Sequence, residues 1–333
     1  MRRYGVMVQI GFHASHEQFP PSQLLRLVRM AESAGFDCAK SSDHFHPWSE
    51  RQGHSGFAWS WLGAAMEATR FPIGMISAPG YRYHPAVLAQ AAATTQEMYE
   101  GRLWLALGSG EAINEAITGE AWPDKHERNL RLLECVDVMR ALFGGETVTH
   151  RGRVTVVEAK LYSRPKTPVP LFGAAVTPRT AKLAGSWADG LLVAGHDQRI
   201  VEPLLEAFGE GGGGGKPVHV QMAVSWARSI DEASVNAVEQ WGPASIGGDA
   251  AWDLRRPADF DHAARFTKAE DMGDVVLVTD SLAQLRDRVH ELGESGVHTV
   301  HLHMVGRDQE GFIAAAAEDG LCNRGKAGER DVK

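Results

Sequence analysis

Residues 73–107 read IGMISAPGYRYHPAVLAQAAATTQEMYEGRLWLAL, and this stretch decides the fold class. The apolar run Ile73–Ala78 predicts a buried strand, Pro85–Tyr99 has a helical pattern, and Leu103–Leu107 is a second apolar run. Strand, helix and strand joined by short turns form the repeating unit of a parallel sheet. The rest of the chain can therefore be searched for further copies of this unit.

Six more predicted strands bring the total to eight. They are Tyr4–Phe12, Phe36–Asp43, Val169–Ala175, Gly190–Ala194, Val218–Val224 and Val297–His303, and helical patterns such as Ser22–Ser33 and Glu127–Phe143 lie between strands. Eight such units predict an α/β protein with a closed (β/α)₈ TIM barrel.

Three stretches fall outside this repeat. Glu146–Val157 alternates around Gly152 and predicts a β-hairpin decoration. Residues 229–274 predict a partly helical insertion that packs over one end of the barrel. Gly211–Gly215 is expected to be a flexible surface linker. We expect one barrel domain over residues 1–322 and a disordered tail over residues 323–333.

Composition excludes several classes of protein. With 44% hydrophobic and 23% charged residues among 333, the chain is typical of a folded globular protein. Its net charge of −8 argues against binding to nucleic acid or to an anionic membrane surface. The three cysteines are too far apart in sequence for a disulfide framework, and the apolar stretch Val6–Phe12 is too short for a signal peptide or membrane span. We expect a cytoplasmic protein.

Chemically capable side chains gather after the predicted strands, where barrel enzymes place their active sites. Asp43 and His44 follow the second strand, and His44 can transfer protons near neutral pH while an adjacent carboxylate orients it. Trp48, in the same loop, can form a pocket wall. Glu111 follows the fourth strand and the glycine-rich segment Gly108-Ser109-Gly110, where backbone can approach a ligand closely. We expect Glu111 to meet His44 across the barrel mouth.

Four segments in combination resemble the luciferase-like flavin oxidoreductases, in the branch around the coenzyme F420-dependent glucose-6-phosphate dehydrogenases. They are Ser42-Asp43-His44-Phe45-His46-Pro47-Trp48, Gly56-Phe57-Ala58-Trp59-Ser60-Trp61, Tyr81-Arg82-Tyr83-His84-Pro85-Ala86 and Gly108-Ser109-Gly110-Glu111-Ala112-Ile113-Asn114-Glu115. The resemblance implies a dimeric barrel that holds F420 or FMN in its mouth and transfers hydride to or from a small organic substrate.

The resemblance also implies roles for individual residues. His44 would be the base on the substrate hydroxyl, Trp48 a stabilising donor and Glu111 the partner acid. The implied cofactor contacts are Asp43, Met75, Ile76, Gly108, Gly110, Asn114, Ala175, Val176 and Thr177. No metal is expected.

Two departures from that branch bear on ligand choice. Val176-Thr177 replaces the glycine pair that receives the cofactor phosphate, which leaves FMN open beside F420; the helix start at Thr177-Pro178 still offers backbone N–H groups to a phosphate. The sugar-phosphate lysines are replaced near Asp197 and His262, and a carboxylate repels a phosphate dianion. Glucose 6-phosphate is therefore not the expected substrate, although Arg255, Arg256 or Lys268 could rebuild an anion site.

Three alternatives stay open at the level of sequence. One is an FMN-dependent monooxygenase of the luciferase-like class. Another is a metal-dependent barrel hydrolase, because His44 and His46 have the spacing of a two-histidine metal site and His301 and His303 lie on the last predicted strand. The third is a flavin-binding protein without turnover.

Overall fold

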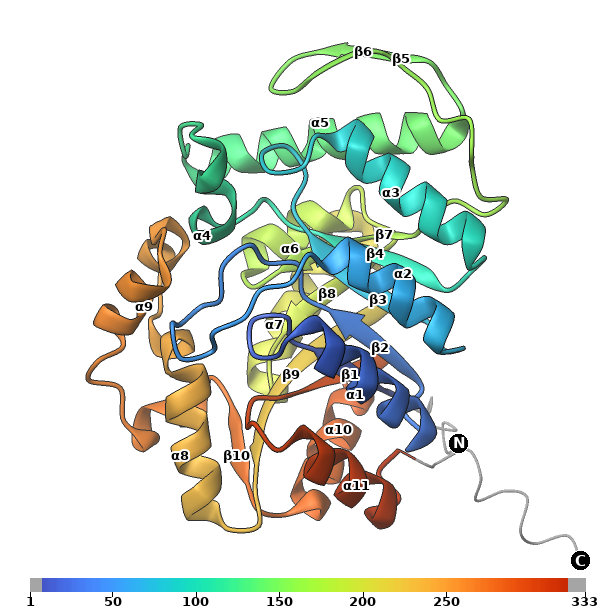
Figure 1. Cartoon of the computed structure of the whole chain (residues 1–333). Coiled ribbons are helices and arrows are strands. Elements are labelled where there is room, and N and C mark those ends of the chain that lie inside the picture. Colours follow the sequence, from blue (N-terminus) through green and yellow to red (C-terminus); the bar gives the residue numbers. More distant parts are fainter. Residues whose placement is uncertain (1–7, 323–333) are drawn as a thin grey trace, which may run out of the picture.

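The computed structural model describes residues 8–322 and shows eight parallel strands that close into a ring, with helices around it (Figure 1). The strands pair in the order β11, β1, β2, β3, β4, β7, β8 and β9, and pairing of β9 with both β8 and β11 closes the ring. The predicted TIM barrel is confirmed. The strands of the ring are β1 (Gln9–Ala14), β2 (Cys38–Ser41), β3 (Ile73–Ser77), β4 (Leu103–Leu107), β7 (Leu171–Ala175), β8 (Gly190–Ala194), β9 (Val218–Trp226) and β11 (Thr299–Met304).

A short strand that the sequence prediction missed joins this sheet. Strand β10 (Leu277–Thr279) pairs in parallel with the last residues of β9, from Val224 to Trp226. Strand β9 has nine residues, so its end extends past the ring and offers a free edge. Three residues are too few to show a pattern of alternation, so no strand is predicted there. Of the predicted first strand, residues 4–7 lie outside the described residues.

The outer layer consists of helices that bury one face against the strands. Helix α1 begins with Pro21 at its first position. Gly35 follows the end of the helix with a φ of 94°, a conformation that glycine adopts without strain because it has no Cβ. The helices are α1 (Pro21–Ser33), α2 (Ala58–Ala68), α3 (Pro85–Met98), α4 (Ala112–Glu115), α5 (Lys125–Gly144), α6 (Pro178–Gly185), α7 (Gln198–Phe208), α8 (Ile230–Trp241), α9 (Pro257–Ala263), α10 (Leu282–Glu294) and α11 (Gln309–Asp319). None of the helices within the described residues is long and apolar enough to cross a membrane.

Both predicted additions to the barrel are present. Strands β5 (Val148–Arg151) and β6 (Thr155–Ala159) form an antiparallel hairpin that lies outside α5, at the top of Figure 1. The late part of the chain is helical: α8 and α9 are accompanied by short 3-10 helices at Gly242–Ser245, Asp249–Asp253 and Ala269–Asp274. Helices α4, α8 and α9 lie on one side of the barrel, at the left of Figure 1.

The glycine run is not the loose surface linker that its composition predicts. Residues Gly209–Gly213 follow α7 as a helical turn that packs against α6 and is interrupted at Gly212, whose φ is 97°, while Gly214 and Gly215 form an exposed turn. A Cβ on Gly211 would lie 2.0 Å from the backbone oxygen of Lys182, and one on Gly185 would lie 2.4 Å from the oxygen of Phe208. Two backbones meet here at a distance that excludes side chains, so the glycines serve packing.

The interior of the barrel is partly polar. The side chains of His13, Lys40, His301 and His303 are buried and that of His219 is half-buried, and the rings of His219 and His301 pack with Trp104. The hydrophobic core is the layer between the outward faces of the strands and the helices, where Leu24, Leu62, Leu105 and Leu171 are fully buried. The ring of strands therefore encloses a stack of polar side chains. The end of this stack at the carboxyl ends of the strands forms the floor of the site described next.

Candidate active site

A cavity opens at the carboxyl ends of the strands. Its floor is formed by Ile76 of β3, Ala174 of β7, Leu192 of β8 and Gln221 of β9. The other lining residues are Asp43, His44, Ser77, Ala78, Gly108, Ser109, Gly110, Glu111, Asn114, Glu115, Lys125, Ala175, Val176, Thr180, Val193, Ala194 and Trp252.

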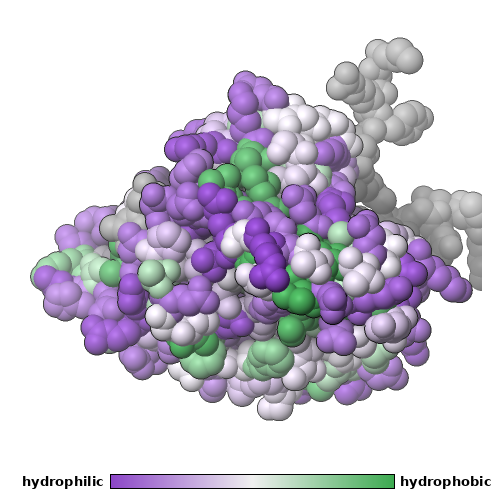
Figure 2. All heavy atoms as spheres, turned by 90° about the horizontal axis from the view of Figure 1, so that it is seen from above, coloured by the Kyte–Doolittle hydropathy of each residue, from purple (hydrophilic) through white to green (hydrophobic). Residues whose placement is uncertain are grey.

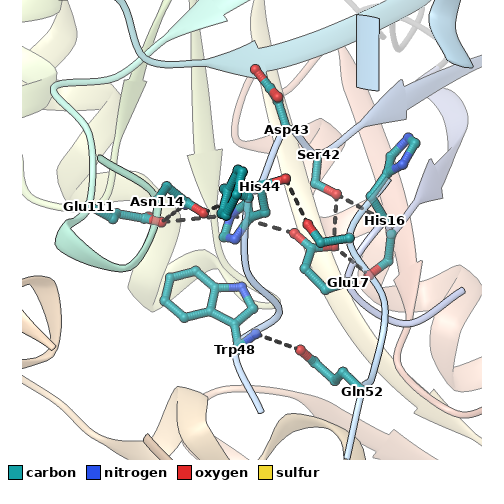
Figure 3. A network of polar contacts seen from close by, with 12 residues as sticks. His16, Glu17, Ser42, Asp43, His44, Trp48, Gln52, Glu111 and Asn114 are labelled. Carbon is teal, nitrogen blue, oxygen red and sulfur yellow. Dashed lines mark hydrogen bonds and ion pairs between the residues drawn. The ribbon is translucent and has the colours of Figure 1, made fainter. Parts of the chain in front are cut away.

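His44 lies between two carboxylates at the edge of this cavity (Figure 3). Its Nε2 is 3.5 Å from Glu17 Oε1 and 3.7 Å from Glu111 Oε2, and the side chain is 12% exposed. The predicted meeting of Glu111 and His44 is therefore present. The buried Nδ1 of His44 has no hydrogen-bond partner within the described residues. A buried polar atom without a partner is unusual and is typical of a functional site.

Glu17 is the site residue that sequence reasoning missed. It follows β1, is buried, and accepts hydrogen bonds on Oε2 from Ser15 Oγ (2.8 Å) and Ser42 Oγ (2.7 Å). Burial alone would raise its pKa, but His44 and these hydroxyl groups stabilise the carboxylate and lower the pKa to about 2. Glu17 is thus ionised beside the imidazole. The strand-end rule that identified His44 and Glu111 would also have identified Glu17, had it been applied to the first strand.

Asp43 does not contact His44, contrary to the prediction that the adjacent carboxylate orients the histidine. Figure 3 shows its carboxylate directed away from the ring. Asp43 accepts hydrogen bonds from Ser77 Oγ (2.7 Å) and Tyr83 OH (2.9 Å), and Arg82 Nη2 lies 3.3 Å from Oδ1. Neighbouring residues on an extended chain point in opposite directions, so Asp43 faces the β3 side while His44 faces the cavity.

Glu111 and Asn114 flank the cavity on the side opposite Glu17. Asn114 Nδ2 donates to Glu111 Oε2 (3.2 Å), and Asn114 Oδ1 accepts from the backbone N–H of Phe45 (2.9 Å). Asn114 thereby links the α4 region to the loop that carries His44. Burial in the cavity and the charge of Glu17 raise the pKa of Glu111, against the opposing effect of His44. Glu17 and Glu111 are therefore pushed toward opposite protonation states, which separates an acid from a base.

The segment after β4 gives the cavity a small-residue wall. Gly108 and Gly110 both line it, and Gly110 has a φ of 82°, a conformation that favours glycine. Ser109 accepts a hydrogen bond from Lys125 Nζ (2.7 Å). Lys125 is the one lysine or arginine among the described residues that line the cavity.

The segment after β7 forms another part of the wall. Ala175 and Val176 line the cavity, whereas Thr177 caps helix α6, its Oγ1 accepting from Thr180 N (3.3 Å). The predicted helix start at Thr177-Pro178 is present, and Thr180 rather than Thr177 faces the cavity. The backbone N–H groups at the start of α6 lie beside the cavity wall, where an anion binds favourably.

Three further predicted residues occupy different places. Ile76 lines the cavity, but Met75 is fully buried in the hydrophobic core and does not, because side chains alternate along β3. Trp48 packs against His44, with ring centroids 4.9 Å apart, and against Phe260 at 5.3 Å. Trp48 therefore packs between His44 and helix α9 and restricts the position of the histidine ring.

His46 points away from His44. Its Nδ1 lies 2.7 Å from the backbone oxygen of Ile113, and it lines a separate surface depression with Ile117 and Leu254. Within residues 8–322, no group of three or more histidine, cysteine, aspartate or glutamate side chains is arranged to hold a metal ion.

Comparison with known proteins matches these features to a family. The sequence profile of "Luciferase-like monooxygenase" matches residues 2–299. The chain belongs to the luciferase-like family. The F420-dependent glucose-6-phosphate dehydrogenase of Beutenbergia cavernae is 35% identical, covering 98% of this chain and 100% of that protein. The enzyme of the same description from Kribbella flavida is 36% identical over 94% of this chain and 97% of its own.

A solved structure gives the same picture for this luciferase-like protein. An F420-dependent secondary alcohol dehydrogenase in complex with an F420-acetone adduct superposes with a TM-score of 0.86 at 30% identity, covering 93% of this chain and 97% of that one. These relatives are oxidoreductases, and the protein is an oxidoreductase of the luciferase-like family.

Proposed function

We propose that the protein is an F420-dependent dehydrogenase that exchanges hydride with an uncharged alcohol or the corresponding carbonyl compound. The observation that carries this proposal is the position of His44 Nε2, which lies between two carboxylates at the edge of the cavity at the carboxyl ends of the strands. The relatives described above support the choice of F420 over FMN.

The cavity residues fit a flat heterocycle with an anionic tail. Ile76, Ala174 and Leu192 provide an apolar floor, and the Gly108–Gly110 segment allows close approach of backbone. Val176 and the start of α6 would receive the phosphate, and Lys125 adds positive charge at the same cavity. The cofactor supplies hydride acceptance and donation.

Three side chains of the site then perform the acid–base work. His44 takes the proton of the substrate hydroxyl while the carbon-bound hydrogen leaves as hydride. The ionised Glu17 stabilises the resulting imidazolium, because its pKa of about 2 keeps the carboxylate charged. Glu111, whose pKa is raised by burial, holds a proton more readily and can donate a hydrogen bond to the substrate oxygen. Trp48 fixes the His44 ring from one side.

The charges around the cavity favour an uncharged substrate. Asp43, Glu111 and Glu115 line it, and Lys125, the one cation, is hydrogen-bonded to Ser109. Asp197, at the place of a sugar-phosphate lysine, caps α7 and pairs with Arg199 Nη2 at 2.7 Å. A phosphate dianion beside His44 would therefore meet the ionised carboxylate of Glu17, while the lysine of the described cavity lining is bonded to Ser109.

Turnover with defined substrates tests this proposal. Purified protein is mixed with F420 or FMN and with either a small secondary alcohol or glucose 6-phosphate, and loss of cofactor absorbance is followed. We expect reduction of F420 by the alcohol and no reduction by the sugar phosphate. Reduction by glucose 6-phosphate would overturn the substrate class, and reduction of FMN alone would overturn the cofactor.

We further propose a homodimer located in the cytoplasm. The side chains of Val87 on α3 and Val157 on β6 are each 58% exposed although apolar. Figure 2 looks down on the side that carries the β5–β6 hairpin and shows hydrophobic residues gathered in a band between hydrophilic ones. Exposed apolar patches of this kind mark protein interfaces. Light scattering during gel filtration should give twice the 36.2 kDa chain mass, and the chain mass itself would contradict the dimer.

A further inference from the structure

Lys40 is a lysine of β2 that lies inside the barrel, directly under the cavity floor. Its side chain is 0% exposed, and its Nζ donates a hydrogen bond of 2.7 Å to Gln221 Oε1. Gln221 lines the cavity. One side chain therefore separates a buried ammonium group from the space that receives the cofactor ring, and the acid–base steps above do not use it.

Lys40 sets the direction of a buried hydrogen-bond chain. An ammonium group only donates, so Gln221 must accept with its oxygen and turn its amide nitrogen toward His303 Nδ1, 3.3 Å away. His303 Nε2 then donates to Gln18 Oε1 (3.0 Å), and Gln18 Nε2 donates to the backbone oxygen of Val305 (2.7 Å). The orientation of Gln221 at the floor is thus fixed from below.

The charge of Lys40 has little compensation in its surroundings. Burial lowers the pKa of His13, His301 and His303, so these neighbouring imidazoles are neutral at pH 7. Burial also lowers the pKa of Lys40 to about 7, while the carboxylate of Glu17 opposes this shift. Buried cations are normally paired. An anion in the cavity would supply the missing partner.

We propose that Lys40, acting through Gln221, is a positioning residue that stabilises the reduced, negatively charged state of the cofactor ring. This inference rests on the proposed function. In the reaction, the substrate C–H bond breaks and its hydride adds to the ring, the hydroxyl proton passes to His44, and the electron pair leaves negative charge on the ring. Lys40 forms no covalent bond; its positive charge lies under the site where that negative charge develops.

The affinity of the protein for oxidised and for reduced cofactor tests the proposal. Tryptophan fluorescence is titrated anaerobically with F420 and with chemically reduced F420, for the parent protein and for Lys40→Met. We expect Lys40→Met to weaken binding of reduced F420 about tenfold relative to oxidised F420, which corresponds to about 30 mV in a two-electron potential. His219→Gln, a change to a half-buried polar residue on β9 that does not line the cavity, is the control and should leave the ratio of the two affinities unchanged.

Gln221→Glu provides a second route to the same quantity. A carboxylate at this position neutralises Lys40, so the affinity for reduced F420 relative to oxidised F420 should fall, as it does in Lys40→Met. This variant replaces Lys40→Met if that protein does not fold. Equal weakening of both redox states, or an unchanged ratio in a folded variant, would assign Lys40 a purely structural role and overturn the proposal. Failure of the parent protein to bind F420 at all would instead overturn the proposed function.

Discussion

His44 and His46 are two residues apart, yet they lie in different environments. His44 faces the cavity between Glu17 and Glu111, whereas His46 is hydrogen-bonded to the backbone of Ile113 beside a separate depression. A pair of histidines at this spacing is therefore not a shared site. It offers instead a matched test of which imidazole does the chemistry.

We predict that His44→Ala lowers the rate of hydride exchange by about 10² to 10⁴-fold, the usual contribution of a positioned base. Cofactor affinity should change little, because the cavity floor and the α6 end are unaffected. His46→Ala should retain the parent rate. Single-turnover absorbance measures the rate and fluorescence titration the affinity. Equal rates for His44→Ala and the parent would remove His44 from the mechanism.

Glu17 predicts a pH-dependent contribution to stability. Its pKa is lowered from 4.5 to about 2, so its contribution is complete above pH 4.5 and is lost as the pH falls toward 2. We predict that Glu17→Gln lowers the free energy of unfolding by about 3 kcal/mol at pH 7 and has almost no effect near pH 2. Urea unfolding at both pH values measures the difference. A gap that is the same at both pH values would show that the ionised carboxylate is not the source.

The pKa of Glu115 predicts a pH dependence of stability that is opposite in sign to that of Glu17. Burial raises its pKa to about 7 despite the nearby Arg82, so ionisation of Glu115 opposes folding at pH values above its ordinary pKa. Glu115→Gln should therefore gain stability relative to the parent as the pH rises from 5 to 8. The same urea measurements test this, and a loss of stability that grows with pH would contradict the assignment.

Of the two carboxylates that flank His44, the sequence predicted Glu111 and missed Glu17. Glu111 was predicted because it follows a glycine-rich segment after a strand, and the same reasoning names Gly108 and Gly110. Asn114 was implied by the family resemblance, and all three of these residues line the cavity. Sequence reasoning chose Asp43 over Glu17 because adjacency in sequence is visible while side-chain direction is not. Contacts between distant segments, such as the Lys40 and Gln221 pair, require the folded barrel.

At the scale of elements, the glycine turn after α7 shows how composition misleads. Five consecutive glycines, Gly211–Gly215, are typical of a linker, yet the first three belong to the helical turn Gly209–Gly213, in which Gly211 lets the backbone of the turn meet that of α6. Strand β10 was also missed, since its partner is an extension of β9 beyond the ring. The long helices were predicted within two residues of their observed bounds, whereas the predicted strand Phe36–Asp43 is longer than the four-residue β2.

We predict that Gly211→Ala destabilises the protein by about 1 to 3 kcal/mol, because its Cβ would lie 2.0 Å from the backbone oxygen of Lys182. Gly209→Ala is the matched control in the same turn. Gly209 has helical φ and ψ of −58° and −47° and no atom within 4 Å of an added Cβ, so alanine should be neutral or stabilising by up to about 1 kcal/mol. Thermal unfolding compares the two, and equal melting temperatures would contradict the close packing.

At the scale of the whole molecule, the barrel explains why residues from separate segments form one site. Parallel strands place all their carboxyl ends on one side, so Glu17, His44 and Glu111 meet although they follow three different strands. The eight strands predicted from the sequence already implied that their carboxyl ends meet on one side of the barrel. The identity of the ligand depended on the combination of motifs and on the relatives, because the fold alone hosts many activities.

Cofactor binding tests the central claim most directly. The purified protein is titrated with F420 and, separately, with FMN, while the fluorescence of its nine tryptophans is recorded. We expect saturable quenching by F420 at a ratio of one cofactor per chain and at lower concentrations than with FMN. Absence of saturable quenching by either cofactor would contradict the account.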